Sequence, residues 1–141
     1  MTEPSGRVAL RSVLRLHHVA TSIVDAELKD GFRLRLIDYL TLTALQTSDV
    51  GAVALGQLAR QLDVHATTIS IAVERMESRR LVRRRIDPHD RRATLVTITD
   101  DGLALADAAT AALERVNFGL PGLSAIQARS LVNLIARIPE R

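Results

Sequence analysis

Apolar residues recur at spacings of three and four along most of the chain, which is the period of an amphipathic α-helix. The first such stripe runs through residues 7–27, and Gly31 interrupts it. A second helix with a broad apolar surface is expected over residues 32–46, ended by the turn-forming segment 47–51. The chain therefore opens with two helices, of which the second suits a buried central position.

Two short helical stripes follow back to back. Apolar residues fall at i, i+3, i+4 and i+7 over residues 55–62, and the same spacing returns over residues 69–76. Only residues 63–66 separate the stripes, which is the layout of a helix-turn-helix. An ordinary helical hairpin in an all-α core is the alternative. The outward face of the second helix favours DNA, because most of its side chains are short enough to let a helix approach base edges. These outward residues are Thr67, Thr68, Ser70, Ile71 and Arg75.

A β-hairpin is expected directly after the second of these helices. Residues 81–86 are a strand candidate with interleaved arginines, and residues 94–98 are β-branched with alternating character. The segment 87–92 between them opens with Asp-Pro, a turn signal, and ends in two arginines. A helix-turn-helix followed by a hairpin with a basic tip has the order of a winged helix.

Two further helices complete the pattern. Thr99 is placed to cap a helix that runs to about Asn117, where residues 119–122 break it. Ser124 and Gln127 form a capping-box pattern before a last amphipathic helix that extends to about residue 138.

The predicted fold is mainly α, a winged helix-turn-helix over about 32–99 with a two-stranded β-hairpin wing and N- and C-terminal dimerisation helices at about 7–27 and 100–138. Residues 1–141 are expected to form one domain. The terminal helices carry apolar stripes that a compact winged-helix core does not need. A second subunit related by a two-fold axis is their expected partner, since such homodimers dominate oligomers; packing back onto the same subunit is the alternative.

Composition narrows the class of protein. The 141 residues are 47% hydrophobic and 25% charged, as expected of one soluble domain. The lack of cysteine excludes disulfides, thiolate metal sites, cysteine nucleophiles and thiol redox sensing. Three aromatic residues are too few for a base-stacking platform. No apolar run approaches the length of a membrane-spanning segment, and residues 1–7 lack the pattern of a secretion signal. We therefore expect a cytoplasmic protein with no membrane partner.

Positive charge is concentrated in one segment. The net charge is +3, but residues 75–92 hold eight arginines and three acidic residues, while the rest of the chain holds eleven basic and thirteen acidic residues. A solvated protein face accounts for some such clusters. A phosphate-binding edge accounts for this concentration better, because arginine forks match phosphate oxygens and released counterions drive binding.

No pattern of an enzyme, metal site or cofactor site is present. There is no glycine-rich phosphate loop after a strand, no nucleophile turn, and no carboxylate pair near a histidine on a shared helix face. His17 and His18 are adjacent and point about 100° apart on a helix, while His65 and His89 lie in the segment expected to face DNA. We therefore predict neither enzymatic activity nor a bound metal or cofactor.

Three runs of sequence follow one another around the predicted wing: Leu-Val-Arg-Arg at 81–84, Asp-Pro-His-Asp-Arg-Arg at 87–92, and Val-Thr-Ile-Thr-Asp-Asp-Gly at 96–102. These runs, the Asp38-Tyr39 pair and the helix order over nearly the whole chain resemble the multiple-antibiotic-resistance regulator (MarR) family of bacterial repressors. The resemblance implies a homodimeric, DNA-binding transcriptional repressor that a small aromatic or lipophilic effector relieves.

The resemblance also implies roles for individual residues. The helix around 66–79 would enter the major groove of a pseudo-palindromic DNA duplex, and Arg92 would enter the minor groove, oriented by an ion pair with Asp90. The effector would lie near His17 and Tyr39. The candidate DNA-binding residues are His65, Ala66, Thr67, Thr68, Ser70, Ile71, Arg75, Arg84, Asp90, Arg91 and Arg92. The arginines at 75 and 83–85 are expected to include both phosphate contacts and ion pairs with Glu74, Glu77 or Asp87.

Three departures from the family pattern leave a second function open. Arg80 stands where family members usually have a glycine in the left-handed conformation, which implies either a different backbone or a strain of about 1 kcal/mol. Ala66 and Ile71 replace long polar residues, although Ile71 can meet a thymine methyl. Gly56 weakens the phosphate contact of the first helix of the motif. The alternative is a winged-helix protein-interaction module that has lost DNA binding.

Overall fold

The computed structural model describes residues 5–139, so the start of the segment considered for a secretion signal, residues 1–4, lies outside the described part, as do residues 140 and 141. The elements are α1 (Ser5–Phe32), α2 (Leu36–Gln46), β1 (Val53–Ala54), α3 (Leu55–Gln61), α4 (Ala66–Ser78), β2 (Val82–Asp87), β3 (Asp90–Ile98), α5 (Asp100–Arg115), the 3₁₀ turn η1 (Asn117–Gly119) and α6 (Ala125–Ile135). This order confirms the predicted mainly helical, winged helix-turn-helix architecture.

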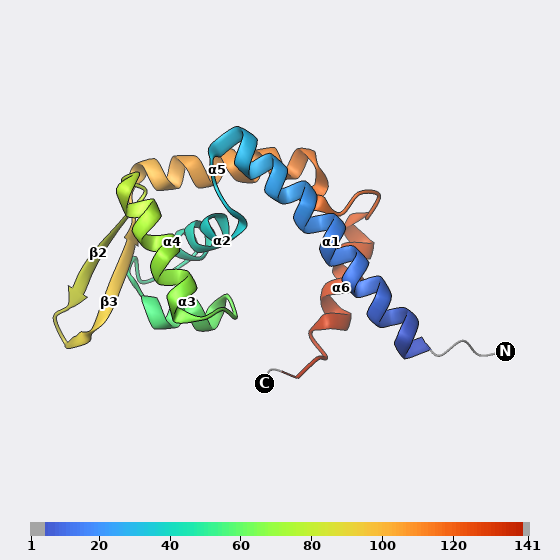
Figure 1. The fold of residues 1–141 in the computed structure, drawn as a ribbon, viewed down its shortest axis with the longest axis horizontal. Coiled ribbons are helices and arrows are strands. Elements are labelled where there is room, and N and C mark those ends of the chain that lie inside the picture. The colour runs from blue at the N-terminus through green and yellow to red at the C-terminus, as the bar shows by residue number, and fades with distance from the viewer. Residues whose placement is uncertain (1–4, 140–141) are drawn as a thin grey trace.

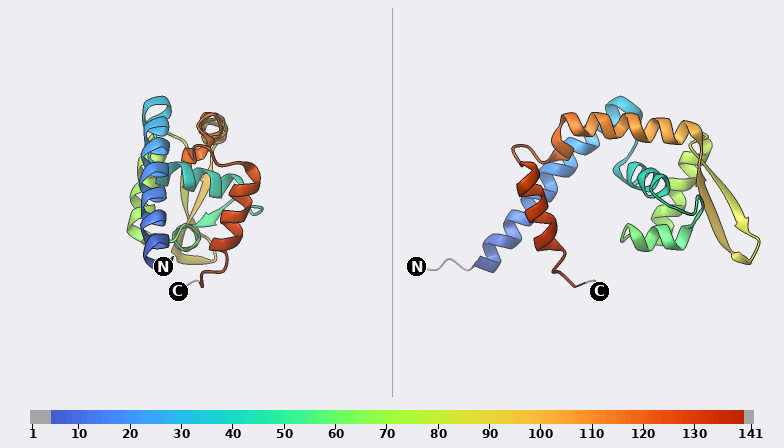
Figure 2. Two further views of the ribbon diagram at one scale, coloured as in Figure 1. Left: turned by 90° about the vertical axis from the view of Figure 1, so that its right-hand side faces the viewer. Right: turned by 180° about the vertical axis from the view of Figure 1, so that it is seen from behind.

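The molecule has the shape of an arch (Figure 1). α5 runs along its top and contacts α1 and α2. The elements α2 to β3 form one lobe beneath α5, and the N-terminal half of α1 forms the other leg beside α6, as the rear view in Figure 2 also shows. The N-terminal half of α1 and α6 are thereby set apart from the winged-helix lobe.

The core lies where α1 enters the winged-helix lobe. Fully buried apolar side chains come from the end of α1, from α2, α3, α4, β3 and α5, and include Leu28, Leu42, Leu58, Ile69, Val96 and Leu113. The predicted stripe of α4 is buried throughout, at Ile69, Ala72, Val73 and Met76. The period of three and four in the sequence therefore identified the inward face of this helix correctly.

The sheet contains one strand more than the predicted two-stranded hairpin. Its order is β1-β3-β2 and both pairings are antiparallel, with Val53 opposite Val96 and Val82 opposite Ile98. β1 is two residues long, too short for alternation to reveal it. β3 begins at Asp90 rather than at residue 94, because backbone pairing extends into the arginine-rich tip of the wing.

Several helix ends differ from the predictions. α1 continues through Gly31 to Phe32, and α2 begins at Leu36 rather than at residue 32. Arg33 ends α1 because it adopts a left-handed backbone with φ of 52°. α5 ends at Arg115, two residues before the predicted Asn117, and α6 ends at Ile135, three residues before the predicted 138.

The predicted helix caps are confirmed. The Thr99 hydroxyl accepts the Gly102 N–H at 3.0 Å at the start of α5. At the start of α6, the Ser124 hydroxyl accepts the Gln127 N–H at 3.2 Å and the Gln127 side chain accepts the Ser124 N–H at 2.9 Å. Each cap satisfies donors that a helix start leaves without a partner, so these two boundaries follow from local chemistry.

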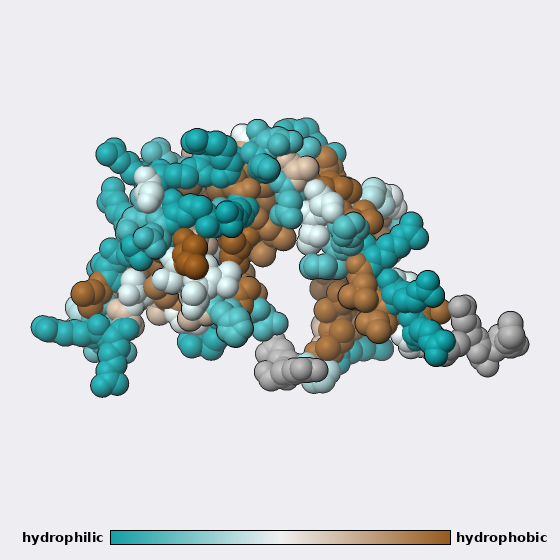
Figure 3. Space-filling model, in the orientation of Figure 1, coloured by the Kyte–Doolittle hydropathy of each residue, from teal (hydrophilic) through white to brown (hydrophobic). Residues whose placement is uncertain are grey.

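The leg of α1 and α6 carries a large exposed apolar surface. The predicted stripe of α1 is exposed at Leu10, Val13 and Leu14 by 59%, 61% and 58%, and no residue of α6 is buried. Figure 3 shows hydrophobic side chains gathered on this leg beneath the arch. Packing within one subunit therefore does not cover the apolar faces of these helices. None of the described helices is long and apolar enough to cross a membrane.

Candidate nucleic-acid interface

The tight turn between α3 and α4 is closed by backbone hydrogen bonds. Asp63 adopts a left-handed conformation with φ of 53°. Its N–H donates to the Arg60 carbonyl at 3.3 Å, and the Val64 N–H donates to the Ala59 carbonyl at 3.0 Å. This pair of bonds is a Schellman closure, which turns the chain sharply after a helix. α4 then starts at Ala66, with His65 as its N-cap residue.

The outward face of α4 is largely as predicted. His65, Ala66, Thr67 and Thr68 are exposed and Ser70 is half-buried, while Ile71 is 55% exposed. These side chains lie opposite the buried stripe, so they are free to meet a ligand. Most of these side chains are short, and a backbone that carries short side chains can lie close to a duplex groove.

The wing supplies an exposed row of arginines. Arg83, Arg84 and Arg85 on β2 and Arg91 and Arg92 on β3 are all exposed. The tip of the wing and the α3–α4 turn lie at the same end of the lobe (Figures 1 and 2). The segment with the excess of positive charge thus borders the outward face of α4.

Arg84 ties the wing to α4. Its Nε and Nη2 donate to Glu77 Oε1 at 3.1 and 2.8 Å, and its backbone N–H donates to Glu77 Oε2 at 3.0 Å. These hydrogen bonds hold the pKa of the Glu77 carboxyl below its ordinary value of 4.5. Glu77 is one of the three acidic partners predicted for the wing arginines. The guanidinium of Arg84 is therefore shared between this contact and solvent.

The predicted ion pair between Asp90 and Arg92 is wrong. Asp90 Oδ1 accepts the backbone N–H of Arg92 at 3.0 Å. Over residues 5–139, the ion pairs are those of Arg75 with Asp38 and of Arg84 with Glu77. The short aspartate side chain folds onto the backbone two residues ahead, as it commonly does in turns. The Arg92 guanidinium is consequently left exposed at the wing.

Arg75 forms an ion pair, one of the two roles that the sequence left open for it, but its partner is not one of the three predicted acids. Its guanidinium pairs with Asp38 of α2, whose side chain is 2% exposed, while the Arg75 side chain is 31% exposed. A buried carboxylate requires a charged or hydrogen-bonding partner, and α4 supplies one. The two residues are 37 positions apart in the sequence, so no local pattern pointed to the pair.

The two residues predicted for an effector lie in different surroundings. Tyr39 is buried, and its hydroxyl forms a 2.8 Å hydrogen bond with the Thr110 hydroxyl of α5. His17 is exposed on α1. An apolar cavity of about 590 Å³ lies between α1 and α6, and its lining, which includes Leu16, Val19 and Leu131, contains neither residue. Among residues 5–139, no three histidine, aspartate or glutamate side chains are grouped so as to hold a metal ion.

The fold and its basic, helix-presenting surface define a winged helix-turn-helix protein. A sequence model of the MarR family matches residues 34–93, from the start of α2 to the wing. The transcriptional repressor NicR of Pseudomonas putida is 36% identical over 108 residues, which cover 77% of this chain and 64% of NicR. The chain belongs to the MarR family, whose members are transcription regulators rather than enzymes.

Solved structures agree with this assignment. Sco5413, a MarR family transcriptional regulator of Streptomyces coelicolor, has a TM-score of 0.85 and 28% identity, covering 95% of this chain and 92% of Sco5413. BpsR of Bordetella bronchiseptica, whose DNA binding is regulated by 6-hydroxynicotinic acid, has a TM-score of 0.77 and 26% identity, covering 96% of this chain and 98% of BpsR. The predicted family is thus confirmed over nearly the whole chain.

Proposed function

We propose that this protein is a homodimeric, sequence-specific DNA-binding repressor of transcription in the cytoplasm. The observation that carries the proposal is that the α3–α4 turn, where the exposed face of α4 begins, and the tip of the arginine-rich wing lie at the same end of the lobe. α4 has the short outward side chains of a major-groove helix, and the wing has the charge that phosphates attract. The contact residues proposed here are those predicted from the sequence, except Arg75.

The role proposed for Arg92 is insertion into a minor groove. Its guanidinium is exposed and makes no ion pair among the described residues. A narrow minor groove has an enhanced negative potential that attracts an inserted arginine. Arg91, beside it, and Arg83 and Arg85, on the neighbouring strand, supply phosphate contacts.

The proposed dimer buries the apolar leg of the arch. α1 and α6 expose apolar side chains that include Leu10, Val13, Leu14 and Ile135. A second copy related by a two-fold axis would cover them and would present two α4 helices to one pseudo-palindromic duplex, with half-sites about one helical turn apart.

The proposed effector is a small aromatic or lipophilic molecule. The support is the likeness to BpsR, whose DNA binding is regulated by 6-hydroxynicotinic acid, an aromatic molecule. His17 and Tyr39 remain the predicted contacts. Binding of the effector would relieve repression by favouring a dimer geometry that fits the duplex less well.

A mobility-shift assay tests the proposal. Wild-type protein should retard duplexes from the promoter regions of its own and neighbouring genes at low salt, and the affinity should fall steeply as salt rises. The Arg92→Ala variant should lose about 1 kcal/mol or more of binding free energy. Absence of any shift at low salt would contradict DNA binding.

The second candidate function is a protein-interaction module, which Ala66, Ile71 and Gly56 favour because they replace the family's usual polar contacts. The Arg92→Ala variant distinguishes this function from DNA binding. An interaction module predicts no sequence-specific shift for wild-type protein and no change on substitution of Arg92.

A further inference from the structure

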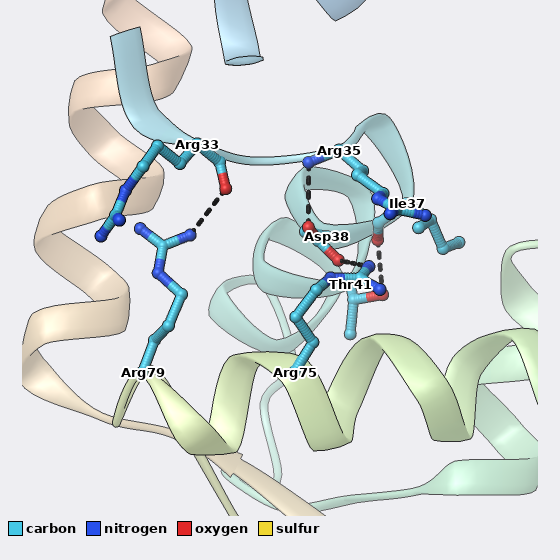
Figure 4. A network of polar contacts seen from close by, with 7 residues as sticks. All are labelled: Arg33, Arg35, Ile37, Asp38, Thr41, Arg75 and Arg79. Atoms are coloured by element: carbon cyan, nitrogen blue, oxygen red, sulfur yellow. Dashed lines mark hydrogen bonds and ion pairs between the residues drawn. The ribbon is translucent and has the colours of Figure 1, made fainter. Parts of the chain in front are cut away.

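Two arginines at the C-terminal end of α4, Arg75 in its last turn and Arg79 directly after it, reach towards the start of the winged-helix lobe (Figure 4). Arg75 pairs with the buried carboxylate of Asp38 on α2. Arg79 Nη1 donates to the Arg33 carbonyl at 2.8 Å, and its Nη2 donates to the Phe32 carbonyl at 3.0 Å. We call these three bonds the α4 clamp. They join α4 to α2 and to the linker 33–35 between α1 and α2.

The linker is itself held in one conformation. Arg33 has a left-handed φ of 52°, and the Leu34 side chain is 2% exposed, packed into the core. Asp38 Oδ2 accepts the Arg35 N–H at 2.9 Å, which starts α2, while its Oδ1 accepts from Arg75. The same carboxylate therefore ends the linker and holds α4.

The clamp restrains α4 in two respects. Arg75 lies in the last turn of α4 and Arg79 is the residue that caps its C-terminal end, so α4 is held at two points near this end. Two grips on different acceptors oppose both rotation of α4 about its axis and displacement along α2. The outward residues Thr67, Thr68 and Ile71 turn with the helix, so their direction depends on the same bonds.

Stability alone does not account for the clamp. The Asp38 side chain is 2% exposed, and Arg75 Nε is buried without a hydrogen-bond partner. A buried ion pair loses much of its attraction to desolvation, and an apolar pair of similar size is often at least as stable. What a charged pair supplies in addition is a defined direction, since a guanidinium and a carboxylate bind only in a few geometries.

We infer that Arg75 and Arg79 are positioning residues that set the orientation of the DNA-reading face of α4 from the α1–α2 linker. This inference rests on the proposed DNA-binding function. Its consequence is that a change in the tilt of α1, whose last residue Phe32 is one of the acceptors, is passed directly to α4. A direct phosphate contact by Arg75, the other role that the sequence left open, is the competing role.

Four variants separate the two roles. Asp38→Asn keeps an oxygen to accept the Arg35 N–H but removes the charge that holds Arg75. Arg75→Met keeps the aliphatic length and removes the donors, while Arg75→Lys keeps the charge. Gln46→Met is the matched control, because it removes another long-range polar contact of α2, the 2.6 Å bond from Gln46 to Asp107 of α5, without touching α4.

The first measurement needs no DNA. Amide hydrogen exchange of the full chain should become faster both in the linker 33–35 and in the last turns of α4 for Asp38→Asn and Arg75→Met, because the two segments lose a shared restraint. Gln46→Met should leave both segments at the wild-type rate. Faster exchange confined to α2, or no change in α4, would overturn the inference.

The second measurement uses a duplex selected by wild-type protein from a randomised library, at a temperature at which all variants are folded. Asp38→Asn and Arg75→Met should each weaken binding about tenfold, roughly the value of one base contact. Affinity for an unrelated duplex and the salt slope should not change, and Arg75→Lys should restore most of the loss. If wild-type protein selects no duplex, the proposed function fails, while hydrogen exchange still decides whether the clamp couples the segments.

A phosphate contact predicts the opposite pattern. Arg75→Met would then lower the salt slope by about one released counterion. Asp38→Asn would leave the affinity unchanged or raise it, because it frees Arg75 for the duplex. That pair of results would refute the positioning role.

Discussion

Arg80 occupies a backbone position that favours glycine. It follows α4 with a left-handed φ of 60°. Its N–H donates to the Glu77 carbonyl at 2.9 Å, and the Leu81 N–H donates to the Met76 carbonyl at 3.0 Å, which completes a Schellman motif. Glycine is the residue that enters this conformation without strain. Of the two explanations considered for Arg80, the strained backbone is therefore the one the structure adopts.

Replacing Arg80 with glycine should stabilise the protein. We expect Arg80→Gly to raise the free energy of unfolding by about 1 kcal/mol, because it removes the left-handed strain of a residue that bears a Cβ. Urea denaturation measures the change. Arg80→Ala is the control, since it removes the same side chain but keeps the Cβ; an equal gain in both variants would show that the charge, not the backbone, is responsible.

At the scale of elements, α4 is held from both sides. The clamp joins it to α2 and the linker, and the Arg84–Glu77 contact joins it to β2. Local pattern predicted α4 and the helix caps, because periodicity and turn chemistry act over a few residues. It did not predict β1 or the partner of Arg75, because a two-residue strand and an ion pair between distant residues have no local signature.

The Arg84–Glu77 contact should make stability depend on pH. The pKa of Glu77 is lowered in the folded protein, so its contribution is present above the ordinary value of 4.5 and is lost as pH falls through the lowered pKa. Glu77→Gln should therefore be less stable than wild-type protein at neutral pH, by less than about 1 kcal/mol because the pair is exposed.

Urea denaturation of wild-type protein and Glu77→Gln at several pH values tests this expectation. The difference between the two proteins should shrink as the solution is acidified below pH 4.5, the ordinary glutamate value. A difference that stays constant or grows on acidification would show that Glu77 is not stabilised as a carboxylate.

At the scale of the whole molecule, the arch separates two surfaces with different chemistry. The wing and α4 form a basic surface rich in short polar side chains, and the leg of α1 and α6 forms an apolar one (Figure 3). α5 spans the distance between them and contacts both α1 and α2. This separation fits the proposed function, in which one surface binds DNA and the other forms the homodimer.

A charge placed on the apolar leg should separate the proposed dimer. Leu14 is 58% exposed on α1, and Leu14→Glu should weaken dimerisation by about 3 kcal/mol, because an unpaired charge would be buried at the interface. Sedimentation equilibrium measures the effect, and circular dichroism should still report a folded, helical chain.

The matched control is Val50→Glu, which adds the same charge at a residue that is 82% exposed in the turn after α2. It should leave association unchanged. A monomeric wild-type protein, or equal dissociation of both variants, would contradict the assignment of the α1–α6 surface to the dimer.

The sequence by itself determined the order of the helices, the caps of α5 and α6, the wing and the family, because each of these depends on residues that are close together in the chain. The α3–α4 turn, the Thr99 and Ser124 caps and the inward face of α4 all follow from such short-range rules. The basic surface follows in the same way, because its arginines are concentrated in the single segment 75–92.

Only the tertiary structure decided which arginines pair with a carboxylate of the same chain. Arg75 is drawn to Asp38 and Arg84 to Glu77, whereas Arg92 is left exposed because Asp90 bonds to the backbone instead. The physical reason is that an arginine pairs with a carboxylate that folding brings within reach, and the buried carboxylate of Asp38 requires such a partner.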